Sequence, residues 1–216
     1  LRNSINRQNT YGLISKLHID VSDELKLQAG IDWRTAGIEH AREVRDLMGG
    51  DFYMDFADDN SPDGKKVGLG DIIAYHNETT VDWLGVFGQG NYTSGPLSAY
   101  GMLGLSQIAY TYQDHFTVAD EVIGHGDPIS TVQWKGGAMY DVTDNVSVYG
   151  NFGIVEKPPI MDNVIYFDGT VASDPANEQF VSAEAGANYS ARNVVVKVSA
   201  YNTDWKDRNL TKAVTS

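Results

Sequence analysis

Apolar and polar residues alternate along much of this chain, in paired segments that are joined by short polar turns. Between Tyr11 and Asp20 large apolar residues recur mainly at odd-numbered positions, and they do so again from Leu25 to Trp33 after the turn at 21–24. Alternation with a period of two over about ten residues predicts a strand with two different faces. The first pair of segments therefore predicts a β-hairpin.

Three further pairs repeat this arrangement, so we predict about eight strands in four hairpins. In the second pair the alternation is less regular, and its clearest face holds Val81, Trp83, Gly85 and Phe87. Connections at 36–78, 113–130 and 156–179 separate the pairs, and another begins near Lys206. The remaining strand pairs are predicted at 79–93 with 97–111, at 134–140 with 146–152, and at 181–189 with 194–200.

Short turns at one end and long loops at the other are typical of an outer-membrane β-barrel. A strand in lipid must pair all its backbone groups with neighbours, and one of its faces meets lipid while the other meets the lumen. We therefore predict an all-β fold, an antiparallel transmembrane β-barrel segment of about eight strands. Aromatic residues near the strand ends fit the girdles at the membrane surfaces. They are Tyr11, Trp33, Trp134, Tyr140, Tyr189 and Trp205.

Two alternatives fit the same alternation. Eight strands suffice to close a complete small outer-membrane barrel with a structural or adhesion role. A soluble all-β binding module with one solvated face shows the same period.

The composition narrows the range of partners. Acidic residues outnumber basic ones by 29 to 16, and the net charge of −13 argues against nucleic acid, which attracts basic surfaces. The chain has no cysteine, which excludes disulfides and thiolate metal sites. It has no run of about 18 apolar residues, as a membrane-spanning helix would need. Its mean hydropathy of −0.31 agrees with a barrel whose strands expose alternate residues to lipid.

The two ends of the chain look like internal positions of a longer protein. The sequence begins within the alternating pattern at Leu1, without a starting methionine or signal peptide, and it stops at Ser216 without a closing element. We expect residues 1–216 to be part of one barrel domain.

Four segments, taken in order, resemble strands of the TonB-dependent outer-membrane receptors, and the form is closest to that of Bacteroidetes-type bacteria. The resemblance covers the chain from about Tyr11 to Arg208. Each motif is weak alone, because barrel strands share alternation, but their order and spacing together are specific. The motifs are FGQGNY (87–92) with LSAY (97–100) and YQDHF (112–116), VYGNFG (148–153) with KPP (157–159), EAGANY (184–189), and AYNTDWKDR (200–208).

The resemblance implies a mid-barrel segment of an active-transport receptor. Such receptors enclose an N-terminal plug in a barrel of about twenty-two strands. TonB supplies energy by binding a short box ahead of the plug, and we find neither plug nor box in this chain. The implied location is the bacterial outer membrane. The implied partners are outer-membrane lipid, TonB through the plug, a surface lipoprotein, and a scarce solute such as a siderophore, cobalamin or a glycan.

Two sets of loop residues are candidates for binding. The carboxylates of Asp55, Asp58, Asp59 and Asp63 are hard oxygen ligands of the kind that Ca²⁺ prefers, although their spacing differs from an EF-hand and a solvated acidic loop has the same composition. Tyr53, Tyr75 and Tyr166 offer rings for stacking on a ligand, and packing within the loops is the alternative.

Other patterns carry no site. The segment from Glu39 to Met48 has the composition of a helix, which we expect to pack over the barrel mouth. The five histidines are scattered, and no two have the spacing that places metal ligands on one face of a helix. We find no nucleophile-elbow or phosphate-loop motif, so the sequence predicts no enzyme and no cofactor beyond a structural Ca²⁺.

Overall fold

The computed structural model describes residues 1–117 and 123–208, and nearly all of the regular structure lies in one antiparallel sheet. The strand order is β1-β2-β5-β6-β8-β9-β10-β11, while β7 pairs with β6, and β3 and β4 form a separate small hairpin. The strands are β1 (Arg2–Asp20), β2 (Leu25–Val44), β3 (Tyr53–Asp55), β4 (Lys65–Val67), β5 (Ile72–Ser94), β6 (Leu97–Asp114), β7 (Ile123–His125), β8 (Ile129–Thr143), β9 (Val146–Lys157), β10 (Glu178–Ala191) and β11 (Val194–Lys206).

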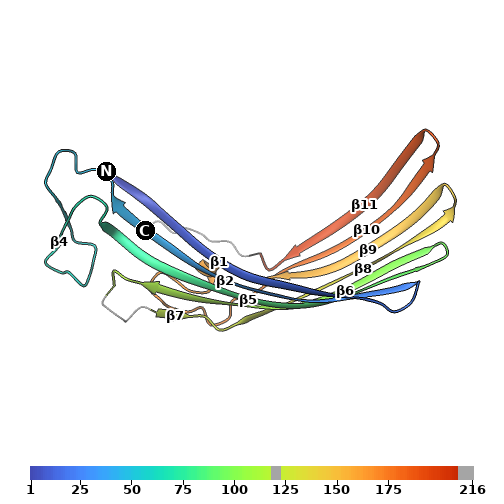
Figure 1. Ribbon diagram of the computed structural model, residues 1–216, viewed down its shortest axis with the longest axis horizontal. Coiled ribbons are helices and arrows are strands. Elements are labelled where there is room, and N and C mark those ends of the chain that lie inside the picture. The colour runs from blue at the N-terminus through green and yellow to red at the C-terminus, as the bar shows by residue number, and fades with distance from the viewer. Residues whose placement is uncertain (118–122, 209–216) are drawn as a thin grey trace.

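The predicted eight long strands and four hairpins are confirmed. Figure 1 shows the four short turns at one end of the curved sheet and the long connections at the opposite end. Every long strand reaches further than its alternation predicted, most of all β2, which continues to Val44. At the loop-side ends the outward face is mostly polar and the inward face mixes polar with buried apolar residues, so alternation stops there although backbone pairing continues. The connection predicted to begin near Lys206 lies mostly outside the described residues.

The helix predicted from Glu39 to Met48 is wrong. Residues up to Val44 continue β2, which is paired with β1 on one side and with β5 on the other. Two neighbouring strands satisfy the backbone groups of this segment, and that pairing outweighs a weak helical propensity. Among the described residues the only helix is the three-residue 3₁₀ turn η1 (Met161–Asn163), and none is long and apolar enough to span a membrane.

The sheet has one apolar and one polar face. Register places Leu13 beside Trp33 and Trp33 beside Leu84, so large side chains continue from strand to strand on the apolar face. Many of them are exposed, with Leu17 at 60% and Val198 at 66%. From Tyr11 to Ile19 the band covers about 27 Å of strand, comparable with the apolar band of outer-membrane barrels. The exposed members are Tyr11, Leu13, Leu17, Ile19, Leu27, Ile31, Trp33, Leu84, Val86, Leu97, Leu103, Leu105, Val132, Trp134, Tyr140, Val148, Phe152, Tyr189, Val194, Val196 and Val198.

The clearest face in β5, with Trp83 and Phe87, lies on the polar side, because Trp83 is opposite Arg34. One expectation about the faces needs correction. Trp205 was expected in a girdle, but it lies on the polar face, where its ring stacks on Phe180 at 5.0 Å. The other five predicted girdle residues lie on the apolar face.

The described sheet is open. Within residues 1–117 and 123–208 no ladder joins β1 to β11, so this chain is not the closed eight-stranded barrel of the first alternative. An exposed apolar face of this size also disagrees with the soluble module. Beyond the band, residues 2–10, 36–44, 72–81 and 110–114 form what we call the extension, in which four paired strands continue past the apolar surface.

Candidate functional site at the loop-side mouth

The connection between β9 and β10, residues 158–177, folds back onto the polar face at the loop side. Val164 and Ile165 are each 1% exposed and pack against Ile108, Tyr110 and Tyr112 of β6. The buried Tyr110 hydroxyl donates a hydrogen bond to the carbonyl oxygen of Pro159 at 3.0 Å. The connection is therefore held against the sheet by apolar packing and one buried hydrogen bond.

Glycine at one position makes this packing close. A Cβ on Gly124 in β7 would lie 2.5 Å from the Cγ2 atom of Ile165 and 3.0 Å from the carbonyl oxygen of Gly169. Only a residue without a side chain lets the connection approach β7 this closely.

A cavity of about 550 Å³ lies between this connection and the loop-side ends of β2, β5 and β6. Its lining combines aromatic rings with carboxylates, an imidazole and an amide, the mixture that small-molecule sites use. The lining residues are His40, Tyr75, Asn77, Thr79, Tyr112, Asp114, Met161, Asp162 and Phe167.

The three candidate tyrosines are not brought together. Tyr75 lines the mouth cavity, and the guanidinium carbon of Arg42 lies 5.1 Å from the centre of its ring. Tyr53, in β3, lines a different cavity of about 620 Å³. Tyr166 lines neither of these two cavities. Its side chain is half exposed, and its backbone amide donates a hydrogen bond to the carbonyl oxygen of Thr170 in a turn. Ligand stacking by Tyr53, Tyr75 and Tyr166 stays a prediction.

The candidate calcium ligands lie apart from one another. Asp55 is 5% exposed, and its carboxylate accepts hydrogen bonds from the backbone amides of Ala57 and Ala74. Ala74 has a φ of 69° at the register shift between β2 and β5, so Asp55 supports an irregular stretch of backbone. Asp58 accepts from the backbone and side chain of Asn60.

No three of the four carboxylates at Asp55, Asp58, Asp59 and Asp63 converge on one point in the described part of the chain. The Ca²⁺ site stays a prediction.

A polar network crosses the polar face nearer the turns. The Tyr149 hydroxyl donates to Glu184 Oε1 at 2.8 Å, and Asn151 Nδ2 lies 3.5 Å from Glu184 Oε2. Tyr100 joins the network through Asn151 Oδ1, also at 3.5 Å. Tyr100, Asn151 and Glu184 line a depression of about 640 Å³ that also includes Lys135. The network links β6, β9 and β10 across the wall.

Glycine again permits the network. A Cβ on Gly186 in β10 would lie 2.6 Å from the ring of Tyr149, and one on Gly137 in β8 would overlap the side chains of Tyr100 and Asn151. The aromatic side chains lie across neighbouring strands at places where no side chain opposes them.

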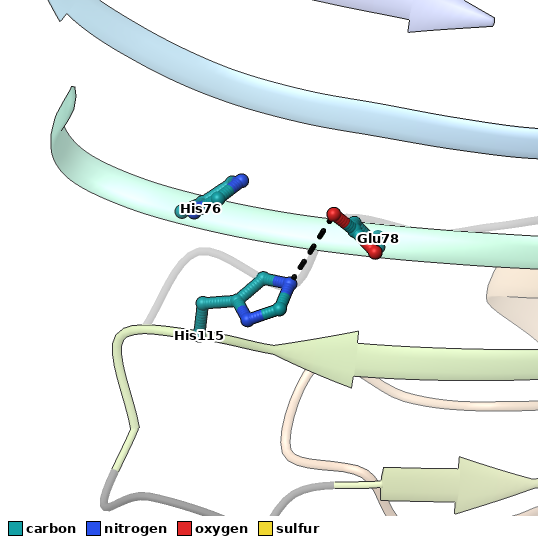
Figure 2. Close-up of side chains that lie close together, drawn as sticks. All are labelled: His76, Glu78 and His115. Atoms are coloured by element: carbon teal, nitrogen blue, oxygen red, sulfur yellow. Dashed lines mark ion pairs between the residues drawn. The ribbon is translucent and has the colours of Figure 1, made fainter.

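A cluster that the sequence did not predict lies on the extension, on the same side as the apolar face. His76 and Glu78 come from β5, and His115 directly follows β6; Figure 2 shows the three side chains together. His115 Nε2 is 3.5 Å from Glu78 Oε1, and the two imidazole centres are 4.4 Å apart. His76 Nε2 is 3.2 Å from an oxygen of Glu39 in β2.

The sequence contained half of the signal for this cluster. His76 and Glu78 are two residues apart, which places them on one face of a strand, whereas the expected spacing of metal ligands was that of a helix. The position of His115 depends on the pairing of β5 with β6, because its amide donates to the His76 carbonyl oxygen at 2.8 Å.

Glu39 also pairs with Arg7 of β1, on the extension. The Arg7 Nη1 lies 3.1 Å from Glu39 Oε2. The hydrogen bond from Arg7 is the main cause that holds the pKa of Glu39 below its usual value, and the neighbouring His76 acts in the same direction. The carboxylate is therefore anionic and fixed between two partners.

Comparison with known proteins agrees with this architecture. Residues 1–215 match the family described as "TonB dependent receptor-like, beta-barrel". The chain is similar to a solved structure titled "Copper transporter OprC" (TM-score 0.69, 14% identity), covering 96% of this chain and 31% of that one. It is also similar to a structure of the "ferric citrate transporter FecA in the unliganded form" (TM-score 0.61, 11% identity), covering 94% of this chain and 29% of that one. No curated protein matches the sequence.

Proposed function

Because the chain belongs to the TonB-dependent receptor-like β-barrel family, we propose that it forms part of the wall of an active-transport receptor that takes up a scarce solute with energy from TonB. Members of this family are outer-membrane barrels, so the apolar face meets outer-membrane lipid and the polar face lines the lumen. The chain spans less than a third of the length of either solved transporter, so the remaining wall and the plug belong to other parts of the receptor.

The observation that carries this proposal is the connection 158–177, folded over the polar face at the loop side. An inward-folded loop narrows the entrance of the lumen and leaves a cavity that opens where a solute arrives. A wall with a purely structural role has no need of such a cavity. Deeper in the lumen, the network of Tyr100, Asn151, Tyr149 and Glu184 faces the position of the plug and offers it polar contacts.

The lining of the mouth cavity favours a neutral or cationic solute with flat apolar faces, as a glycan has. Tyr75 and Phe167 offer ring faces, and the Phe167 side chain is 72% exposed. Asp114 and Asp162 add negative charge, and the lining, all within the described residues, includes no lysine or arginine. The printed names of the two solved neighbours refer to copper and ferric citrate, but identities of 14% and 11% carry the fold and not the solute.

The hairpin of β3 and β4 is the best candidate contact for a surface lipoprotein. It lies in the connection 45–71, apart from the rest of the sheet at the loop side in Figure 1. Met48, Phe56 and Leu69 are largely exposed in this connection.

Binding to the full-length receptor in detergent tests the proposal. Isothermal titration calorimetry measures the receptor's affinity for neutral oligosaccharides, for cobalamin and for an anionic ferric siderophore. Uptake of the same solutes is followed in cells with and without TonB. We expect TonB-dependent uptake, and binding of a neutral solute that is weakened by Tyr75→Ala and by Phe167→Ala. A matched Tyr11→Ala variant, at an exposed ring on the apolar face away from the cavity, should bind normally. If cells without the receptor took up every one of these solutes as well as cells with it, the transport function would be contradicted.

A further inference from the structure

The cluster of His76, Glu78 and His115 combines ligand types that bind transition metals. Each residue offers one ligand atom, and the three atoms lie within 4.8 Å of one another. Imidazole and carboxylate ligands of Zn²⁺ lie about 2.0–2.2 Å from the metal, which puts them about 3.3 Å apart in a tetrahedral site. Small side-chain rotations would bring the three atoms to that separation, because all three side chains are partly exposed.

From this arrangement we infer that His76, Glu78 and His115 bind one divalent first-row transition-metal ion, Zn²⁺ foremost, on the outside of the extension. Two imidazoles and one carboxylate suit Zn²⁺, Ni²⁺ and Cu²⁺ better than the harder Ca²⁺ or Mg²⁺. Three protein ligands leave at least one coordination position for water.

The state of His115 is a second observation that points to a ligand. Its Nε2 is buried and has no hydrogen-bond partner among the described residues, because the contact with Glu78 at 3.5 Å lacks hydrogen-bond geometry. Buried polar atoms are nearly always satisfied. The ring also lies beside that of His76, and two imidazolium cations at this distance would repel each other. A shared metal ion satisfies the nitrogen and keeps both rings neutral.

Glu39 completes the surroundings of the cluster. From the neighbouring β2, its carboxylate contacts Nε2 of His76, and Arg7 holds the carboxylate in place. Metal-bound histidines commonly contact a carboxylate that fixes the orientation of the ring. Glu39 is therefore a positioning residue for the cluster.

The location of the cluster assigns it a structural role. It lies on the side of the extension opposite to the mouth cavity, so a bound ion is not on the route through the lumen. The ligands come from β5 and from the residue after β6, so the ion would tie the loop-side ends of these strands together. Side-chain exposures of 21% for His76 and 30% for His115 leave a path for the ion to enter.

Calorimetric titration of the full-length receptor with ZnCl₂, after treatment with EDTA, tests this inference. We expect one more bound Zn²⁺ per wild-type receptor than per His115→Gln or Glu78→Gln variant. Substitution of a ligand should weaken this site by more than about tenfold, the scale that even outer-shell changes reach. Co²⁺ in place of Zn²⁺ should give the visible absorption of a bound ion in the wild type only. The matched control is His18→Gln, an exposed histidine on the polar face of β1.

Thermal unfolding supplies a second readout. Zn²⁺ should raise the melting temperature of the wild type and of His18→Gln, and should leave that of the two ligand variants unchanged. Circular dichroism confirms that the variants are folded. Equal Zn²⁺ stoichiometry and affinity in wild type and ligand variants would overturn the inference and identify the cluster as a set of ion pairs. The inference does not depend on the transport function, since a receptor that transports nothing would still bind the ion.

Discussion

Replacement of Gly186 by alanine tests whether the crossing of aromatic side chains over glycine stabilises the wall. The added Cβ would lie 2.6 Å from two ring carbons of Tyr149 and 2.7 Å from its hydroxyl oxygen. These separations are too short for any side-chain contact, so the ring must leave the surface of β10. Its hydrogen bond to Glu184 at 2.8 Å is then lost.

The expected change in the free energy of unfolding is the difference of two effects. Inserting a carbon atom into space that is already occupied typically costs about 1–3 kcal/mol, because the neighbouring side chain must leave its preferred position. Removal of a glycine from a strand interior contributes about 0.5–1 kcal/mol in the opposite direction. We therefore expect Gly186→Ala to destabilise the barrel by about 1–2 kcal/mol.

Urea unfolding of the full-length receptor in lipid vesicles measures this change. Gly88→Ala is the matched control, because its Cβ meets nothing within 4 Å and it should stabilise the barrel slightly. In a Tyr149→Ala background Gly186→Ala should no longer be destabilising, since there is no ring to displace. If Gly186→Ala costs nothing in the wild type, or costs the same without the Tyr149 ring, the reasoning is wrong.

Three further outcomes follow from the loop-side contacts. Tyr110→Phe removes the buried hydrogen bond to Pro159 and should destabilise the packed position of the connection 158–177 by about 1 kcal/mol. We expect faster proteolysis of that connection, and an unchanged rate would contradict the role of the hydroxyl. Asp55→Asn replaces one of two accepting oxygens by a donor and should lower the free energy of unfolding in urea by about 1–3 kcal/mol. An unchanged free energy would show that the irregular backbone at Ala74 needs no carboxylate. The backbone amide of Thr170 holds the pKa of Asp168 below its usual 3.8, so this turn is stabilised above that pH and loses the contribution as the pH falls through the lowered value. Protection of the Thr170 amide from exchange, relative to its intrinsic exchange rate at each pH, should fall over that window in the wild type and not in Asp168→Asn.

The membrane part of the fold could be predicted because lipid imposes a strict rule on sequence. Residues such as Leu13, Leu17 and Ile19 must be apolar at every second position, and the turn at 21–24 must be short. The loop-side ends follow no such rule, since water surrounds both faces there. The segment after Glu39 therefore looked helical, although pairing with β1 and β5 makes it a strand.

The candidate sites depended on contacts that one sequence does not contain. Tyr75, one of the predicted stacking residues, lines the mouth cavity, but the cavity itself exists because Val164 and Ile165 fold onto β6. The register that sets His115 beside His76 follows from the pairing of complete strands.

The strand order has a consequence for how such walls change over evolutionary time. Each long strand pairs with its neighbour along the chain, and every hairpin starts and finishes at the loop side. A hairpin is therefore a unit that can be duplicated or deleted as a block. Such an event alters the circumference of the wall by two strands, yet every remaining side chain keeps its orientation toward lipid or lumen. Inheritance by pairs of strands explains why these barrels vary in size in even steps.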